Sequence, residues 1–337
     1  MNRFFPIAFA ALLLAARAAA APDDATVCAK GPPAGALAAC DRAVKKGGAP
    51  QTVAVLYFNR AAANQASGLA ARALADYGAA IRLRPDFVAA YFNRALLLID
   101  DHRDKEAFAD LTKVTDLEPL MSSGHIFLGI ANDNLNRHAA ALHEFDIGVQ
   151  LAGADARAYG SRGLSHLRYD EYAAALADFN QAIALDSSFA VIVSARGAAY
   201  RYLHRLVEAD RDFDRAVALA PKDSIVLGHR CWHRAATKRR FDLAQKDCDA
   251  AVSAKPDDPD PYDTRGFLAL QEGHNDKAIA DYSLALSLDP RYASSLFGRG
   301  IARRRSGDRA GGDQDIAAAQ AIDPRVGHAY AIEGVRP

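Results

Sequence analysis

The stretch that decides the fold is residues 259–292, which read PDPYDTRGFLALQEGHNDKAIADYSLALSLDPRY. Counted from Pro259, small or aromatic residues and a late proline stand at positions 4, 8, 11, 20, 24, 27 and 32: Tyr262, Gly266, Ala269, Ala278, Tyr282, Ala285 and Pro290. Two antiparallel helices approach closely only where small side chains lie at the crossing. The spacing therefore predicts a helical hairpin, with Gly273 ending the first helix and Pro290 following the second.

The same pattern recurs along most of the chain. Counting outward from this stretch gives eight consecutive units, of which the sixth holds one extra residue: 54–87, 88–121, 122–155, 156–189, 190–223, 224–258, 259–292 and 293–326. One such hairpin cannot bury its apolar side alone, so it must stack on its neighbours. Half of the residues are hydrophobic, with much alanine and no convincing alternating strand pattern. We expect an all-α solenoid of stacked antiparallel helix hairpins.

This pattern of small, aromatic and proline residues resembles the tetratricopeptide repeat (TPR). The resemblance covers residues 54–326 and implies the superhelical stacking of that family. It is specific for the fold and not for a binding partner.

The two ends of the chain depart from the repeat. Residues 1–20 are typical of a cleaved signal peptide, with Arg3 before an apolar segment and small residues at Ala18–Ala20. A segment retained as a membrane anchor is the alternative, although the apolar stretch is short for a bilayer. We expect residues 21–53 to form a degenerate half repeat that caps the array, and residues 327–337 to cover its last hydrophobic face.

Four cysteines allow three pairings, and their positions favour Cys28 with Cys40 and Cys231 with Cys248. In an oxidising compartment both pairs should form disulfides. A zinc or copper site is the rival interpretation, because His229 and His233 lie four residues apart around Cys231. The cysteine should point into the hairpin and the histidines elsewhere, so we expect no metal. These cysteines resemble those of exported TPR proteins of proteobacterial type.

Two charged positions also keep the repeat phase. Position 7 is arginine in seven units and position 23 is acidic in all eight; only the third unit has Leu128 and Glu144 there. We expect each arginine to pair with the acid of its own hairpin and fix helix register. The clearest expected pairs are Arg162 with Asp178, Arg196 with Asp212, and Arg265 with Asp281. A basic ladder for an anionic ligand is the functional alternative.

The overall charge and the motifs exclude several classes of protein. Lys and Arg together number 41, as do Asp and Glu, so no net field draws nucleic acid or an anionic membrane. There is no nucleophile pattern, no HExxH motif and no glycine-rich phosphate loop after a strand. We therefore expect no enzyme activity, no cofactor and no integral membrane segment after signal cleavage.

The TPR resemblance implies a partner-binding groove lined by the first helices of the hairpins. The groove residues carried over from the family, together with rim arginines, are Phe58, Phe92, Ile126, Arg168, Arg201, Trp232, Phe267, Phe297 and Arg304. Trp232, the one tryptophan of the chain, is the strongest candidate. Position 9 often contacts the next repeat, so Leu96, Ile130 and Leu164 are expected to pack rather than recognise. The lysines and asparagines of a two-carboxylate clamp are absent.

Together these features predict a secreted or periplasmic, non-catalytic scaffold or adaptor that holds a segment of another protein in its groove. The alternative is a cell-envelope module that recognises a glycan or lipid-like ligand, and a remote third is an enzyme or metal-binding protein. The partner's identity and the oligomeric state are not encoded in the repeat pattern.

Overall fold

The computed structural model of the protein describes residues 23–30 and 33–336. The predicted signal peptide, residues 1–20, lies outside them. The described residues form nineteen helices and no strand, so the predicted all-α class with hairpin stacking is confirmed. The chain divides into two compact units, one ending at Pro119 and the other beginning at Leu120, and each is described by itself.

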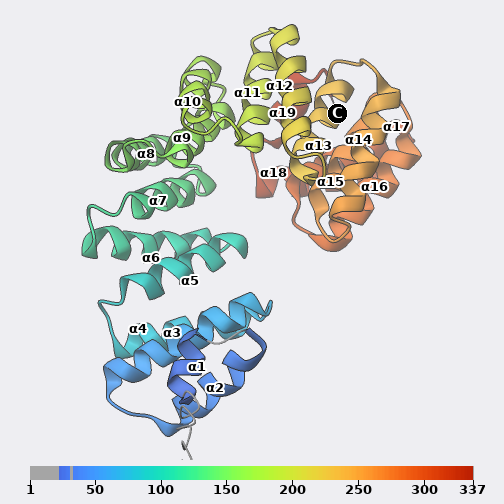
Figure 1. The fold of residues 1–337 in the computed structure, drawn as a ribbon. Helices are drawn as coiled ribbons and strands as arrows, with labels where there is room; N and C mark the ends of the chain where they lie inside the picture. Colours follow the sequence, from blue (N-terminus) through green and yellow to red (C-terminus); the bar gives the residue numbers. More distant parts are fainter. Residues whose placement is uncertain (1–22, 31–32, 337) are drawn as a thin grey trace, which may run out of the picture. The chain divides into compact units, whose positions relative to one another are not determined.

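The first compact unit consists of three helical pairs that follow one another in sequence (Figure 1). Their bounds are α1 Asp24–Lys30, α2 Pro33–Lys46, α3 Pro50–Ala66, α4 Ala70–Leu83, α5 Val88–Asp100 and α6 Asp104–Leu117. Each odd-numbered helix packs on the even-numbered helix after it, and α2 and α4 also contact the next pair.

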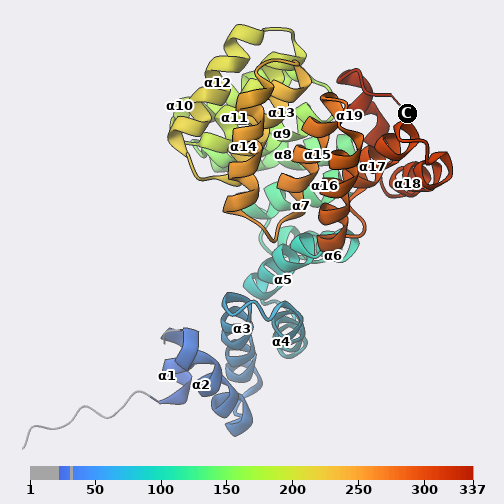
Figure 2. The ribbon, with the colours of Figure 1, turned by 90° about the vertical axis from the view of Figure 1, so that its right-hand side faces the viewer.

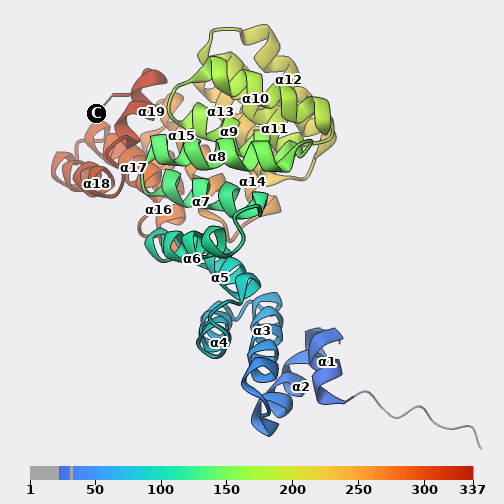
Figure 3. The ribbon, with the colours of Figure 1, turned by 90° about the vertical axis from the view of Figure 1, so that its left-hand side faces the viewer.

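The second compact unit stacks six hairpins and ends in a short helix. The bounds are α7 Ser122–Asn134, α8 His138–Ala152, α9 Ala156–Arg168, α10 Tyr172–Leu185, α11 Ala190–Tyr202, α12 Leu206–Leu219, α13 Ser224–Ala236, α14 Phe241–Ala254, α15 Pro259–Gln271, α16 Asn275–Leu288, α17 Ala293–Arg305, α18 Arg309–Ile322 and α19 Val326–Ile332. Helix α19 contacts α17 and α18 and lies beside α17 in Figures 2 and 3.

In four hairpins the glycine at position 8 lies under the aromatic ring at position 24 of the same hairpin: Gly129 under Phe145, Gly163 under Phe179, Gly197 under Phe213 and Gly266 under Tyr282. A Cβ added to Gly163 would come within 2.7 Å of Phe179, and one added to Gly266 within 2.9 Å of Tyr282. Carbon atoms pack best at about 3.5–4.0 Å, so a methyl group does not fit there. The two rings are fully buried. This contact explains why position 8 of the repeat takes a small residue.

The turn between the two helices of each hairpin imposes a left-handed backbone at position 15. Gly273 has a φ of +81° there, which glycine adopts without strain. The other hairpins from α3 onward also have positive φ at this position, and five of them place a larger residue in it: His102, Asn136, Asp170, His204 and Lys238. The turn geometry therefore belongs to the fold, and glycine is not required for it.

Seven arginines at position 7 each donate Nε and Nη2 to the two carboxylate oxygens of the aspartate at position 23, at 2.6–3.0 Å. The pairs are Arg60–Asp76, Arg94–Asp110, Arg162–Asp178, Arg196–Asp212, Arg230–Asp247, Arg265–Asp281 and Arg299–Asp315. Such two-pronged pairs combine charge with fixed geometry.

The same arginines also reach the preceding hairpin, which the sequence analysis did not foresee. In six of them Nη1 donates to a polar side chain one helix earlier, at 2.8–3.4 Å: Asp41, Asp146, Asn180, Asp214, Asp249 and Ser283. Beside Arg94 this place is taken by Gly78, which has no side-chain acceptor. In these six hairpins one guanidinium therefore links the two helices of its own hairpin and also bonds to the preceding helix.

The hairpin α7/α8 replaces the arginine pair by another interaction. Leu128 stands at position 7, and the carboxylate of Glu144 is bonded instead to Nδ1 of His125 at 2.8 Å. His125 is buried. Three changes therefore occur together in the first hairpin of the second compact unit. The arginine is missing, glutamate replaces aspartate, and a histidine binds the glutamate.

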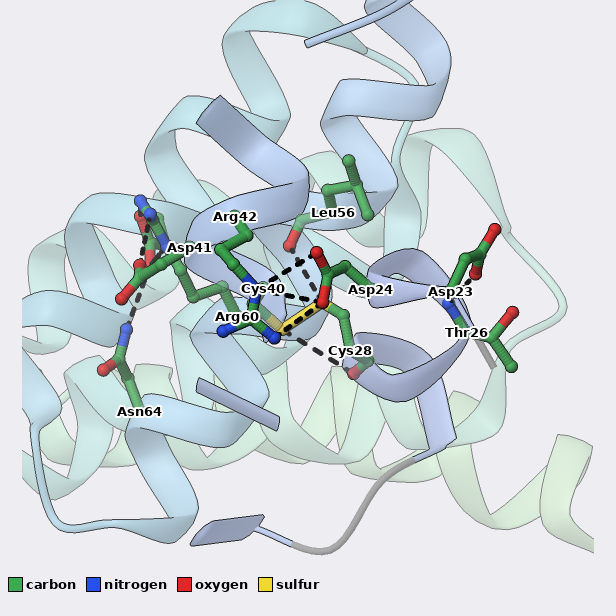
Figure 4. The surroundings of a disulfide bond; sticks show 11 residues. Asp23, Asp24, Thr26, Cys28, Cys40, Asp41, Arg42, Leu56, Arg60 and Asn64 are labelled. Atoms are coloured by element: carbon green, nitrogen blue, oxygen red, sulfur yellow. Dashed lines mark hydrogen bonds and ion pairs between the residues drawn. A yellow bond between two sulfur atoms is a disulfide. The ribbon is translucent and has the colours of Figure 1, made fainter. Parts of the chain in front are cut away.

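Both cysteine pairs lie at disulfide distance. Cys28 and Cys40 join α1 to α2, with an S–S distance of 2.08 Å, and Figure 4 shows the ion pair of Arg42 with Asp24 beside them. Cys231 and Cys248 join α13 to α14, with an S–S distance of 2.01 Å. The second pair occupies positions 8 and 24, where other hairpins place a small residue under a ring. The covalent bond therefore replaces that contact.

Replacing Arg196 by Met should lower the free energy of unfolding by about 3 kcal/mol, because Asp212 would stay buried without its partner. Urea unfolding followed by circular dichroism measures the loss. The double variant Arg196→Met/Asp212→Leu should recover most of it, and Arg211→Met, on the exposed side of α12, should change little. Equal effects of Arg196→Met and Arg211→Met would contradict the structural role.

Breaking the Cys231–Cys248 bond should cost about 3 kcal/mol, since it closes a short loop of the unfolded chain. In a Cys28→Ala/Cys40→Ala variant, a reducing agent acts on this bond alone, and the urea midpoint should fall. In the variant lacking all four cysteines the same agent should have no effect. Full recovery of free thiols by non-reducing peptide mapping would rule the bond out.

Candidate functional site

Three of the nine predicted groove residues meet at one cavity of the second compact unit. This cavity, of about 520 Å³, is lined by Arg168 of α9, Arg201 of α11 and Trp232 of α13. Its walls are first helices of consecutive hairpins, together with the C-terminal helix α19. Further lining side chains are Leu164, Leu167, Ala195, Ala198, Tyr202, Phe213, His229, Ser294, Asp323, Arg325, Val326, His328, Tyr330 and Ile332, with Asp170 from the α9–α10 turn.

Two more predicted groove residues lie directly behind the cavity. The ring of Phe267 is stacked flat on Trp232, with centroids 3.7 Å apart, and is fully buried. Phe297 is 2 % exposed and packs against Tyr330. Both residues support the cavity wall and neither is open to a partner.

The structure places the remaining four predicted residues elsewhere. Phe58 of the first compact unit packs on Tyr77 and Phe87. Phe92 is half-buried in the same unit. Ile126 is buried in the second unit and contacts Gly148. Arg304 is exposed and forms an ion pair with Asp313 at 2.8 Å. None of these four lines the cavity.

Leu164 differs from the expectation that position 9 only packs between repeats. Its side chain is 42 % exposed and lines the cavity. Leu96 and Ile130, at the same position, are half-buried, and Ile130 packs on the core around Phe145. Ala195 and Ala198 of α11 line the same cavity, and their small side chains leave space open beside Leu164.

The C-terminal segment does more than cover the last hairpin. Helix α19 packs on α17, and Tyr330 is bonded through its hydroxyl to Tyr282 and Ser294. The chain then reaches across to α11, where Glu333 accepts from Nη1 of Arg201 at 2.6 Å, with both side chains buried. This segment therefore forms one wall of the cavity.

A second set of contacts holds the start of α19 to the α9–α10 turn. Asp170, which has the left-handed backbone of position 15, accepts from Arg325 at 3.1 Å and lies 2.9 Å from Nε2 of His328. Sequence reasoning missed Asp170 and Glu333 because their partners lie far along the chain and outside the repeat phase. No signal in the repeat pattern could have paired them.

Polar side chains also line the cavity. His229 is exposed, and its Nδ1 lies 2.7 Å from Oγ of Ser194. Nε of Arg201 has no hydrogen-bond partner within the described part of the chain. The cavity thus combines apolar walls with cationic side chains, Arg168 and Arg325, and carboxylates, Asp170 and Asp323.

The three side chains considered for a metal site around Cys231 each have another partner. Cys231 is held in its pair with Cys248, while Nδ1 of His229 contacts Ser194 and Nε2 of His233 contacts Asp210 at 2.7 Å. The three side chains therefore serve separate interactions. Among the described residues no helix has the length and apolarity that a bilayer crossing requires.

Comparison with known proteins indicates which fold the chain has. Residues 259–292, the stretch quoted at the outset, match the family model described as tetratricopeptide repeat. The described residues have the fold of a tetratricopeptide-repeat solenoid. No curated protein matches it.

Solved TPR structures resemble the chain at low sequence identity. The hetero-tetramer Cut9–Hcn1 of APC/C gives a TM-score of 0.58 at 15 % identity, covering 89 % of this chain and 59 % of that one. A tetratricopeptide repeat protein from Parabacteroides merdae ATCC 43184 gives 0.54 at 17 %, covering 73 % and 98 %. YrrB, a TPR protein with an unusual peptide-binding site, gives 0.44 at 21 %, covering 57 % and 97 %. The first two resemblances show the fold alone.

The carboxyl of Asp263 supplies a pH test of the packing behind the cavity. Burial raises its pKa to about 7, although Ser294 and Ser295 donate hydrogen bonds to it. Because the folded protein holds this proton more tightly than the unfolded chain, stability is lost as the pH rises from about 4 to 7.

Asp263→Asn should remove that loss. The stability of the variant relative to the natural protein should rise by about 4 kcal/mol between pH 4 and pH 8. Urea midpoints at each pH measure the difference. Asp242→Asn, at an exposed carboxylate of α14, is the control and should give a flat difference. A flat difference for Asp263→Asn as well would show that its proton is not held.

Proposed function

We propose that this TPR protein is a non-catalytic adaptor that binds a segment of a partner protein at the cavity around Trp232. The observation that carries the proposal is the cavity itself, because its walls come from the first helices of consecutive hairpins. Stacked helical repeats are solenoids whose extended concave surfaces serve binding. The four predicted groove residues that do not line or support the cavity, Phe58, Phe92, Ile126 and Arg304, stay expectations.

The contacts of the C-terminal segment indicate what this surface accepts. Tyr330 packs its ring against Trp232, Phe267 and Phe297, with centroid distances of 6.3, 5.8 and 5.2 Å. Glu333, one turn later, supplies a carboxylate to Arg201. A partner segment that inserts an apolar side chain beside Leu164 and presents an acidic group to Arg168 would use the same chemistry. Helical segments offer such spacing.

A second candidate function is recognition of a glycan or lipid-like ligand of the cell envelope. It is favoured by one observation: α19 bounds the groove, so that the space left is a pocket of about 520 Å³. Pockets of about 300–1,000 Å³ are typical of small-molecule sites. An open groove would have favoured an extended protein segment over a small molecule.

We further propose that the protein acts outside the cytoplasm, in the periplasm or after secretion. Two cysteine pairs at disulfide distance support an oxidising compartment. The proposed export signal, residues 1–20, precedes the array.

Leu164→Asp should weaken partner binding at least tenfold, because it places a carboxylate in the apolar wall and repels an acidic segment. The probe is a pool of twelve-residue peptides carrying one large apolar side chain flanked by acids. Trp232, the single tryptophan, reports binding to the full chain by fluorescence. Trp232→Ala is a poorer test, since the loss of its stack on Phe267 would also lower stability.

Leu284→Asp is the matched control, since this leucine of α16 is 47 % exposed and does not line the cavity. It should leave affinity within twofold of the natural chain, and circular dichroism should show both variants folded. Equal affinities of the two variants would contradict the site. If oligosaccharide or lysophospholipid pools change the fluorescence and peptides do not, the second candidate replaces the first.

A further inference from the structure

Two histidines and a glutamate from neighbouring hairpins converge at one corner of the second compact unit. His138 begins α8, His166 lies in the last turn of α9, and Glu171 immediately precedes α10. One ligand atom of each lies within 4.8 Å of the others. Nδ1 of His166 lies 2.5 Å from Oε2 of Glu171, and Nε2 of His138 lies 3.3 Å from the same oxygen. Three metal-binding atoms therefore face one point.

Hydrogen bonding within the protein satisfies this cluster only in part, since Nδ1 of His166 is bonded to Glu171 and Nδ1 of His138 lies 3.4 Å from Oγ of Ser165. Nε2 of His138 is buried and has no hydrogen-bond partner in the described part of the chain. Its contact with Glu171 has ion-pair distance but does not qualify as a hydrogen bond. A buried nitrogen without a partner is costly, and a bound cation would use its lone pair. This atom is an observation independent of the clustering.

Each histidine also has a carboxylate behind its other nitrogen. Nδ1 of His138 is 3.7 Å from Oδ1 of Asp133, and Nε2 of His166 is 3.8 Å from Oδ2 of Asp178. Both aspartates are buried, and Oδ1 of Asp133 makes no hydrogen bond within the described residues. Metal-binding histidines usually orient their second nitrogen toward a carboxylate or carbonyl in this way.

The ring of His138 is also held in place. Tyr169 stacks on it with a centroid distance of 3.7 Å and an interplanar angle of 21°. Arg325 lies 4.7 Å from the centroid of the Tyr169 ring. The imidazole therefore has a fixed orientation, as a ligand must.

We propose that His138, His166 and Glu171 bind one divalent transition-metal ion of the zinc class. Two imidazole nitrogens and one carboxylate oxygen suit such an ion, and a fourth position would be left to water. The ion would tie the hairpin α7/α8 to α9/α10. No ligand motif in the sequence links His138 with His166, because the two lie on different hairpins.

Isothermal titration with Zn²⁺ alone tests the proposal on the full, oxidised, untagged chain after treatment with a chelator. One ion should bind per chain. His166→Ala should weaken the affinity at least 100-fold, and Glu171→Gln, a milder change at an exposed side chain, at least tenfold. Zn²⁺ should also raise the melting temperature of the natural protein and not that of His166→Ala.

His143→Ala is the matched control, since this histidine lies exposed on α8, the same helix as His138, and outside the cluster. It should bind zinc as the natural chain does. Asp133→Asn should weaken binding about 10–100-fold through the orientation of His138. Co²⁺ should give the intense visible absorption of a four-coordinate site, and Glu171→Gln should lose it.

Two results would overturn the proposal. The first is an absence of stoichiometric zinc binding by the natural chain at micromolar concentration. The second is unchanged affinity in both His166→Ala and Glu171→Gln, which would place any bound ion elsewhere. Because zinc titration uses no peptide, failure here leaves the adaptor proposal unaffected, and failure of peptide binding leaves the metal site unaffected.

Discussion

The close approach of two helices under an aromatic ring is the constraint on which the rest of the structure depends. At Gly163 and Gly266 there is no room for a single methyl group beneath Phe179 and Tyr282. Hairpins that carry this pair of residues therefore meet the same limit on the distance between their two helices. Where the ring and the small residue are absent, at Cys231 and Cys248, a disulfide takes their place.

The seven arginines at position 7 fix the register of the packed helices. Because Nε and Nη2 are used within the hairpin, Nη1 is free to bond to the helix before it, as from Arg162 to Asp146. Packing of small residues alone would let one helix slide along its neighbour. The planar guanidinium prevents this, because its donors have a fixed geometry. The hairpin α7/α8, where Leu128 stands instead, uses His125 for its glutamate and has no such guanidinium.

Both proposed binding sites depend on departures from the repeat. Leu164, Ala195 and Ala198 line the cavity, and the residue after the last helix, Glu333, binds Arg201 of α11. The histidine cluster likewise depends on residues that hold no repeat phase. The uniform part of the molecule builds a scaffold, and its irregular side chains supply the chemistry.

The amino-acid sequence by itself determined the all-α class, the hairpins and the phase of the small residues, since these follow from local periodicity and size. It also favoured the cysteine pairs and the arginine–aspartate pairs, whose partners lie within one hairpin. Only the tertiary structure showed that Phe267 is buried behind the cavity and that Leu164 lines it. The exposure of a side chain depends on which side chains of the neighbouring repeat pack against it. The pairings of Arg201 with Glu333 and of His138 with His166 were likewise decided by folding, since no sequence period links residues that meet only when hairpins stack.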